Sequence, residues 1–141
     1  MPKNILIDAG FWIALYTERD QWHQDATLYD EYLTVHKLIL PWPSFYEFLN
    51  TRFAGNQSGM LSFRKRILQP NVVRLLDSPY REPALTKFLE LTRTGRRLSL
   101  VDLVMREILS DESAKIDAMV TFNESDFADL CALRRIEFFN G

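Results

Sequence analysis

The fold of this chain is constrained most strongly by an alternation of short apolar runs with longer segments of helical periodicity. Each short run is typical of a strand buried on both faces, and apolar residues recur at helical spacing between most of the runs. We predict strands at 4–8, 37–41, 72–76, 117–122 and 136–139. Because parallel strands need crossover helices, the alternation predicts a three-layer α/β/α sandwich with a mostly parallel central sheet.

Helices are predicted in the segments between these strands. We place them at 11–16, 20–35, 45–53, 61–68, 82–94, 100–109 and 127–133. Ser44 is the expected N-cap of one helix, and Glu47, three residues later, matches the spacing of a capping box. The helix at 82–94 is expected to bury an apolar face that carries Leu85, Phe88, Leu89 and Leu91.

The length and composition are those of an ordinary globular protein. The 141 residues suit a single domain, 1–141, and no apolar run reaches the roughly 18–20 residues that a membrane-spanning helix needs. The lone Cys131 excludes an internal disulfide, so a reducing cytoplasm is the expected location. The net charge of −2 does not by itself indicate a nucleic-acid partner.

Acidic and amide side chains recur where predicted strands end or predicted helices begin. Asp8 ends the first strand, Glu47 and Asp102 lie in first helical turns, and Asn123 and Asp126 follow the strand at 117–122. In a parallel sheet these places share one edge, so the groups can converge. Converging carboxylates repel one another unless a cation joins them, and an all-oxygen ligand set favours Mg²⁺ or Mn²⁺.

Each acid also has a structural explanation that requires no function. Asp8 can cap the helix that follows it, Asp102 can complement a helix dipole, and Glu47 can belong to the capping box. The local sequence leaves both interpretations open. No glycine-rich phosphate loop is present, which argues against nucleotide hydrolysis of the P-loop type.

Four segments, in this order, resemble the PIN domain family, and the chain is similar in size to its VapC-type ribonuclease toxins. The matching residues are Ile5–Leu15, Pro43–Phe48, Leu98–Asp102 and Val120–Phe127. The resemblance implies a Mg²⁺- or Mn²⁺-dependent endoribonuclease that cleaves single-stranded RNA. It also implies a toxin that is blocked by an antitoxin protein and that forms a homodimer, for which Phe45, Phe48 and Phe53 are candidate interface residues or, equally, core residues.

The resemblance assigns roles to the acids. It implies Asp8, Glu47 and Asp102 as an acidic triad and Asp126 as the fourth catalytic acid, with Asn123 assisting through a polar contact. Asp8, Asp102 and Asp126 would bind the metal, while Glu47 would bind metal or orient the attacking water.

Three positions depart from the family pattern. Ala9 stands where relatives often carry Thr or Ser, Gly10 where Asn or Ser is common, and Asn123 where many carry Asp. Loss of groups that orient a metal ligand weakens metal binding. The alternative function is therefore a catalytically weak PIN-like module that binds RNA or a protein. A phosphate-accepting receiver domain ranks last, because Asp8 has no adjacent acid.

Basic residues and aromatic rings are the expected contacts for an RNA substrate. Trp12 and Trp42 are candidates for base stacking, although both could instead belong to the core. The cationic candidates, which could equally form ordinary solvated helix faces, are Arg64, Arg66, Arg93 and Arg97, together with Lys65 and Arg96.

Overall fold

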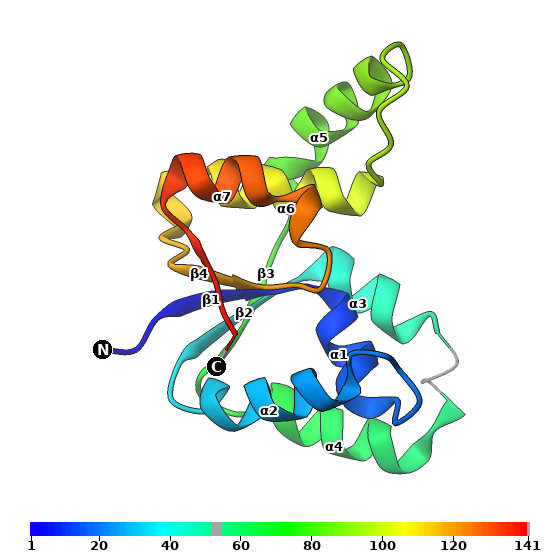
Figure 1. The fold of residues 1–141 in the computed structure, drawn as a ribbon, viewed down its shortest axis with the longest axis vertical. Coiled ribbons are helices and arrows are strands. Elements are labelled where there is room, and N and C mark those ends of the chain that lie inside the picture. The colour runs from blue at the N-terminus through cyan, green and yellow to red at the C-terminus, as the bar shows by residue number, and fades with distance from the viewer. Residues whose placement is uncertain (52–54, 141) are drawn as a thin grey trace.

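A five-stranded sheet, parallel throughout, runs through the centre of the protein (Figure 1). The computed structural model describes residues 1–51 and 55–140. The strands lie in the order β3-β2-β1-β4-β5. Their bounds are Asn4–Ile7 (β1), Lys37–Pro41 (β2), Val72–Leu75 (β3), Ala118–Val120 (β4) and Glu137–Phe138 (β5). The predicted parallel sheet is confirmed, and each strand lies within the segment predicted for it.

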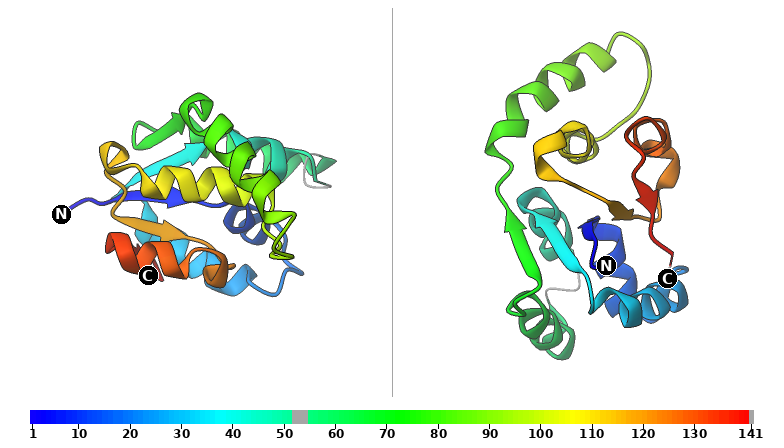
Figure 2. Two further views of the ribbon diagram at one scale, coloured as in Figure 1. Left: turned by 90° about the horizontal axis from the view of Figure 1, so that it is seen from above. Right: turned by 90° about the vertical axis from the view of Figure 1, so that its left-hand side faces the viewer.

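Helices cover both faces of the sheet, which confirms the three-layer sandwich (Figures 1 and 2). One face carries α1 (Ala9–Tyr16), α2 (His23–Leu33), α3 (Trp42–Leu49) and α4 (Gln57–Ile67). The other carries α5 (Ser78–Leu91), α6 (Leu100–Ser110) and α7 (Ala128–Arg134). Short 3₁₀ turns occur at Glu112–Ala114 (η2) and Glu124–Asp126 (η3). Within the described residues, no helix has the length and apolar character needed to span a bilayer.

The central strand is apolar at consecutive positions because helices bury it from both sides. Ile5 and Ile7 pack into the core under α1 to α4, whereas Leu6 packs into the core under α6 and α7. All three side chains are fully buried. Successive side chains of a strand point to opposite faces, so a strand covered on both sides must be apolar at every position.

The direction of the sheet's growth reverses between β1 and β4. The chain first adds β2 and β3 on one side of β1, and then returns to add β4 and β5 on the other. Ile7 of β1 pairs with Val120 of β4, so Asp8 and Thr121 emerge side by side at the carboxyl edge. In open α/β sheets this reversal leaves a crevice where ligands bind.

The helix that carries Glu47 begins earlier than its sequence predicts. Pro41 is the N-cap of α3, and Ser44 is buried inside the helix, where its hydroxyl donates to the Met105 sulfur at 3.9 Å. The predicted capping box is therefore wrong. Pro43 is compatible with the first turn because an N–H there needs no helical partner, so α3 can start before it. α3 also ends earlier than predicted, at Leu49 with Asn50 as its C-cap, and Phe53 lies outside the described residues.

The structure differs from the sequence analysis on the apolar face of α5, which was expected to be buried, and decides whether Phe45 and Phe48 belong to an interface or to the core. Leu85 and Leu89 of α5 are 41% and 58% exposed, because this helix packs mainly on α6 and extends away from the sheet (Figure 1). By contrast Phe45 and Phe48, considered as interface residues, are buried in the core of the chain itself.

Phe127 should be a major source of stability on the α7 side of the sheet. It is fully buried and follows directly after Asp126. Phe127→Ala is expected to lower the free energy of unfolding by about 3–5 kcal/mol, because it leaves a cavity in a packed core. Leu133→Ala on α7, where the side chain is 79% exposed, should change it by less than about 0.5 kcal/mol. Urea denaturation of both variants tests this, and similar losses would contradict it.

Candidate active site

Asp8 is a buried carboxylate held between the two halves of the sheet. Its side chain is only 4% exposed. One oxygen, Oδ1, accepts a hydrogen bond from the backbone N–H of Ala9 at 2.8 Å, so Asp8 does cap α1. The other, Oδ2, accepts from the hydroxyl of Thr121 at 2.9 Å. Because buried charge is costly unless it is hydrogen-bonded, these two donors are what allow the carboxylate to remain here.

Thr121 is a partner of Asp8 that the sequence analysis missed. It is buried, follows β4 as Asp8 follows β1, and also accepts a hydrogen bond from the N–H of Asn123 at 3.1 Å. A hydroxyl beside Asp8 was expected from position 9, where this chain has alanine. Thr121 supplies that hydroxyl from the neighbouring strand. The contact between Thr121 and Asp8 could have been predicted only from the register of β1 against β4, which pairs Ile7 with Val120.

Asp102 lies in the first turn of α6. The helix begins after Ser99, whose Oγ accepts a hydrogen bond from the Asp102 N–H at 3.0 Å. Ser99 is thus the N-cap, and the half-buried Asp102 side chain is free of the capping role. At this position the helix dipole favours a carboxylate, as the sequence analysis expected for Asp102. This structural role is compatible with a role in a functional site.

The charges of four acids act on one another. Burial raises the pKa of Asp8 above its usual range, and the charges of Asp102 and Asp126 raise it further, against the hydrogen bonds from Thr121 and Ala9. The pKa of Glu47 rises to about 7, first through burial and then through Asp8 and Asp102. The pKa of Asp102 is raised by burial and by Asp126. The structure therefore brings Asp8, Glu47, Asp102 and Asp126 into one electrostatic cluster.

Among the described residues, this acidic cluster has no ion-paired counter-charge. In the part of the chain that the structure describes, no Lys or Arg forms an ion pair with any of the four carboxylates. Arg106 comes near, but its guanidinium donates to the backbone carbonyl of Asp126 and binds both oxygens of Asp129, all at 2.8 Å. Excess negative charge is left at the carboxyl edge, and a hard cation is the kind of ion that compensates it.

The acids are not gathered into a ready-made metal cage. Across residues 1–51 and 55–140, no group of three or more Asp, Glu, His or Cys side chains is placed to hold one ion. The donor set fits a divalent ion in chemistry and charge, while the side chains stand further apart than ligands of a single ion.

Asn123 and Asp126, in the turn after β4, have different relations to the acidic cluster. Asp126 ends η3 with a half-buried side chain, and its charge reaches Asp8 and Asp102. Asn123 is exposed, and its backbone N–H is what joins the hydrogen-bonded chain through Thr121 to Asp8. At Gly10, an added Cβ would meet nothing within 4 Å, so the missing side chain leaves open space at the start of α1.

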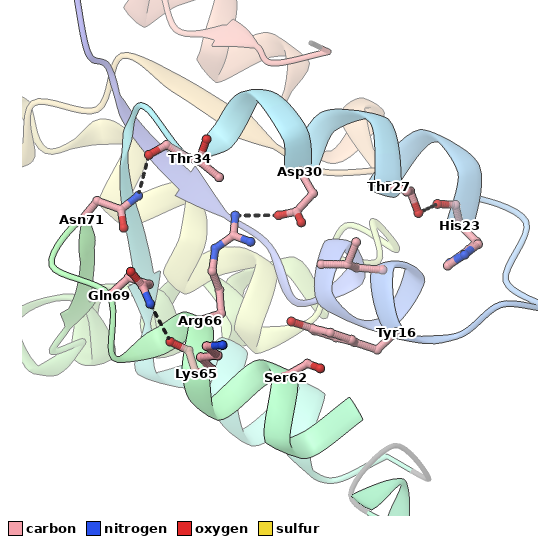
Figure 3. A pocket seen from close by; sticks show the side chains of 11 residues that line it. Tyr16, His23, Thr27, Asp30, Thr34, Ser62, Lys65, Arg66, Gln69 and Asn71 are labelled. Carbon is pink, nitrogen blue, oxygen red and sulfur yellow. Dashed lines mark hydrogen bonds and ion pairs between the residues drawn. The ribbon is translucent and has the colours of Figure 1, made fainter. Parts of the chain in front are cut away.

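The four arginines considered for substrate binding are scattered. Arg66 pairs with Asp30 at 2.5 Å and lies 5.8 Å over the ring of Trp12. It lines a cavity of about 620 Å³ between α2 and α4, to which none of the four acids contributes (Figure 3). Arg64 is exposed on α4. The structure thus does not bring these two to the acidic cluster.

Arg93 and Arg97 are exposed in the segment that joins α5 to α6. Arg97 lines a hollow together with Ser99, the N-cap of the helix that carries Asp102. Arg96 lines the same hollow, and none of the four acids contributes to it. Of the two tryptophans proposed for stacking, Trp12 is 1% exposed and belongs to the core, and Trp42 is half-buried against Phe45 and Tyr46.

Lowering the pH should stabilise the metal-free protein. The Glu47 carboxyl has a pKa of about 7 in the folded protein, against 4.5 for an unperturbed glutamate. The folded state therefore binds this proton more tightly, and the free energy of unfolding falls as the pH rises from about 4.5 to about 7. The raised pKa values of Asp8 and Asp102 act in the same direction. The effect of Glu47 should be modest, because its side chain is desolvated only in part and its solvent-exposed portion lets water screen the charge.

Urea denaturation in EDTA at about pH 5 and about pH 7.5 measures this dependence. Glu47→Gln should flatten it, whereas Glu31→Gln, which removes an exposed carboxyl from α2, should leave it as in the wild type. A pH dependence that is equally steep in both variants would contradict the assignment.

Comparison with known proteins supports the fold. No protein-family model and no curated protein sequence matches the chain. Among solved structures, the chain is similar to VapC20 of Mycobacterium tuberculosis, a toxin that cleaves the sarcin–ricin loop. The TM-score is 0.69 at 19% sequence identity, and the match covers 89% of this chain and 94% of VapC20. The chain therefore has the PIN-like fold of a VapC-type toxin, as its resemblance in sequence predicts.

Proposed function

We propose that this protein is a metal-dependent endoribonuclease that cleaves phosphodiester bonds of single-stranded RNA and acts as the toxin of a toxin–antitoxin pair. The observation that carries the proposal is the cluster of four mutually interacting carboxylates at the β1/β4 crevice, which has no ion-paired Lys or Arg among the described residues. The fold shared with VapC20, an RNA-cleaving toxin, supports it.

Asp8, Asp102 and Asp126 are the residues proposed to hold Mg²⁺ or Mn²⁺. A divalent ion bound there supplies a Lewis acid for the phosphodiester and for the attacking water. Thr121 and the N–H of Ala9 keep the Asp8 carboxylate oriented and favour its ionised form. Among the described residues no three acids are placed to hold one ion, so we expect side chains of Asp8, Asp102 and Asp126 to adjust when they bind it.

Glu47 is proposed to orient the attacking water and to accept its proton. A general base works best when its pKa lies near the working pH, and the Glu47 pKa of about 7 meets this condition. Its position within α3, rather than at a cap, leaves the carboxylate available for this role. Asn123 is proposed to assist through the chain of hydrogen bonds that ends on Asp8.

The remaining elements of the proposal concern partners and location. An antitoxin protein would silence the enzyme by covering the acidic cluster, and the toxin would act on RNA in the cytoplasm. A homodimer would bury the exposed apolar side chains that α3, α5 and α6 share along one groove, among them Tyr46, Leu85 and Leu100.

Removing one acid should abolish RNA cleavage. Asp102→Asn, and separately Asp8→Asn, is expected to reduce Mg²⁺-dependent cleavage of single-stranded RNA and of a sarcin–ricin hairpin at least about 100-fold. Glu31→Gln is the control with an exposed carboxyl, and circular dichroism verifies that each variant is folded. Cleavage by Asp102→Asn at the rate of the wild type would refute the nuclease assignment.

The second candidate function is a PIN-like module that binds RNA or a protein without cutting. It is favoured by Ala9, Gly10 and Asn123 and by the spacing of the acids, which is too wide for one ion. Metal binding separates it from the nuclease.

Titration calorimetry with Mn²⁺ should detect binding at millimolar metal or below in the wild type and weaker binding in Asp102→Asn. At about ten times the dissociation constant, the metal should raise the free energy of unfolding by roughly 1.4 kcal/mol. Absence of binding at millimolar Mn²⁺ would favour the non-cutting module.

A further inference from the structure

Three aromatic rings form a stack beside the acidic cluster. Trp22, at the start of α2, lies parallel to Phe122, with ring centroids 5.0 Å apart and an interplanar angle of 3°. Tyr29, further along α2, also stacks with Phe122, at 6.1 Å and 27°. We refer to Trp22, Phe122 and Tyr29 as the aromatic stack. Phe122 is distant in sequence from Trp22 and Tyr29, which both belong to the start of α2 or to the helix itself, so tertiary packing brings Phe122 to them.

Phe122 attaches the aromatic stack to the catalytic edge of the sheet. It follows Thr121, whose hydroxyl donates to Asp8, and precedes Asn123, whose N–H donates to Thr121. On the other side of the stack, the charge of Glu124 in η3 contributes to raising the pKa of Tyr29, after burial and Asp25. The turn that carries Asp126 is therefore close enough to Tyr29 for the charge of Glu124 to act on it.

Trp22 is the most exposed member of the stack. It is 38% exposed, whereas Phe122 and Tyr29 are half-buried. Its backbone is held in place, because its N–H donates to Asp20 Oδ1 at 2.8 Å and its carbonyl accepts from the N–H of Ala26 at 2.9 Å. The indole is therefore a flat apolar surface, rigidly supported from behind and open to solvent.

A ring of this kind suits a nucleobase. Bases that are not paired stack on aromatic side chains, and this attraction does not depend on charge. That property matters here, because the acidic cluster repels RNA phosphates and has no ion-paired Lys or Arg among the described residues. An uncharged contact can hold RNA beside the acids without neutralising them.

We propose that Trp22, supported by Phe122 and Tyr29, is a substrate-binding residue that stacks with an unpaired base of RNA next to the phosphodiester to be cut. This inference rests on the proposed function and specifies it further. It replaces Trp12 and Trp42 as stacking candidates and predicts a preference for RNA whose bases are unpaired near the cleavage site.

The first test measures RNA binding with Asp102→Asn protein, which keeps the RNA intact. A short single-stranded oligoribonucleotide should quench tryptophan fluorescence, and most of the quench should disappear in Trp22→Phe, because Trp12 is 1% exposed and Trp42 is half-buried. The same oligoribonucleotide annealed to its complement should quench less. Equal quenching of Asp102→Asn proteins with tryptophan or phenylalanine at position 22 would overturn the proposal.

The second test compares affinities and kinetics. Trp22→Ala should weaken binding of the single strand about 5- to 150-fold, the range that corresponds to the loss of one stacked base. Trp22→Phe should restore most of the affinity. In the active enzyme the loss should be found in KM more than in kcat. Tyr32→Ala, which removes another exposed ring of α2 (50% exposed), is the matched control and should bind as the wild type does.

The outcomes separate this inference from the nuclease proposal. If the wild type cleaves RNA and Trp22→Ala binds and cleaves equally well, the stacking role is refuted and the nuclease stands. If the wild type does not cleave but Trp22 is still quenched by single-stranded RNA, the nuclease is refuted and the stacking role stands. Thermal melting of Trp22→Ala and Trp22→Phe verifies folding, and loss of affinity that phenylalanine does not restore would overturn the stacking role.

Discussion

Burial of the central strand from both sides is the constraint on which the rest of this structure depends. β1 is covered by α1 to α4 on one face and by α6 and α7 on the other. To cover both faces, the chain must build outward from β1 in one direction and then return to build in the other. In open α/β sheets such a reversal is where ligand crevices form, and the first residues beyond β1 and β4, Asp8 and Thr121, are hydrogen-bonded to each other at this place.

The acidic cluster at this crevice opposes stability. A carboxylate that is 4% exposed and surrounded by others raises the energy of the ionised state, as the elevated pKa values of Asp8, Glu47 and Asp102 show. Among the described residues, no Lys or Arg forms an ion pair with these acids, and Arg106 is engaged with Asp129 and with a backbone carbonyl. Strongly perturbed carboxylates in a crevice are typical of functional sites, where a cation or a substrate completes the charge balance.

The negative charge of the acidic cluster limits which side chains can lie next to it. A cationic side chain placed among the acids would pair with them and occupy the site that a metal ion needs. The aromatic stack provides an apolar surface at the same edge, through Phe122 in the segment that leaves β4. The proposed enzyme would thus bind the metal with carboxylates and an RNA base with the uncharged ring of Trp22, and the segment after β4 carries both Phe122, on which Trp22 stacks, and Asp126.

The sequence by itself determined the strands, the parallel sheet and the places where the acids would appear, because these depend on local periodicity and on the covering of both sheet faces. It was less accurate for helix starts: the pattern around Ser44 matched a capping box, whereas Pro41 and Pro43 allowed α3 to begin earlier. The face of α5 was also misjudged, since periodicity identifies apolar positions but not whether a partner covers them.

Only the tertiary structure decided which side chains meet. The bond from Thr121 to Asp8 depends on the register of two strands at opposite ends of the chain. The engagement of Arg66 with Asp30, and the stacking of Trp22 on Phe122, likewise join residues that no local pattern relates. Sequence periodicity reports which face of an element is apolar, whereas partners are selected by non-local packing, and the chemistry of this site depends on those partners.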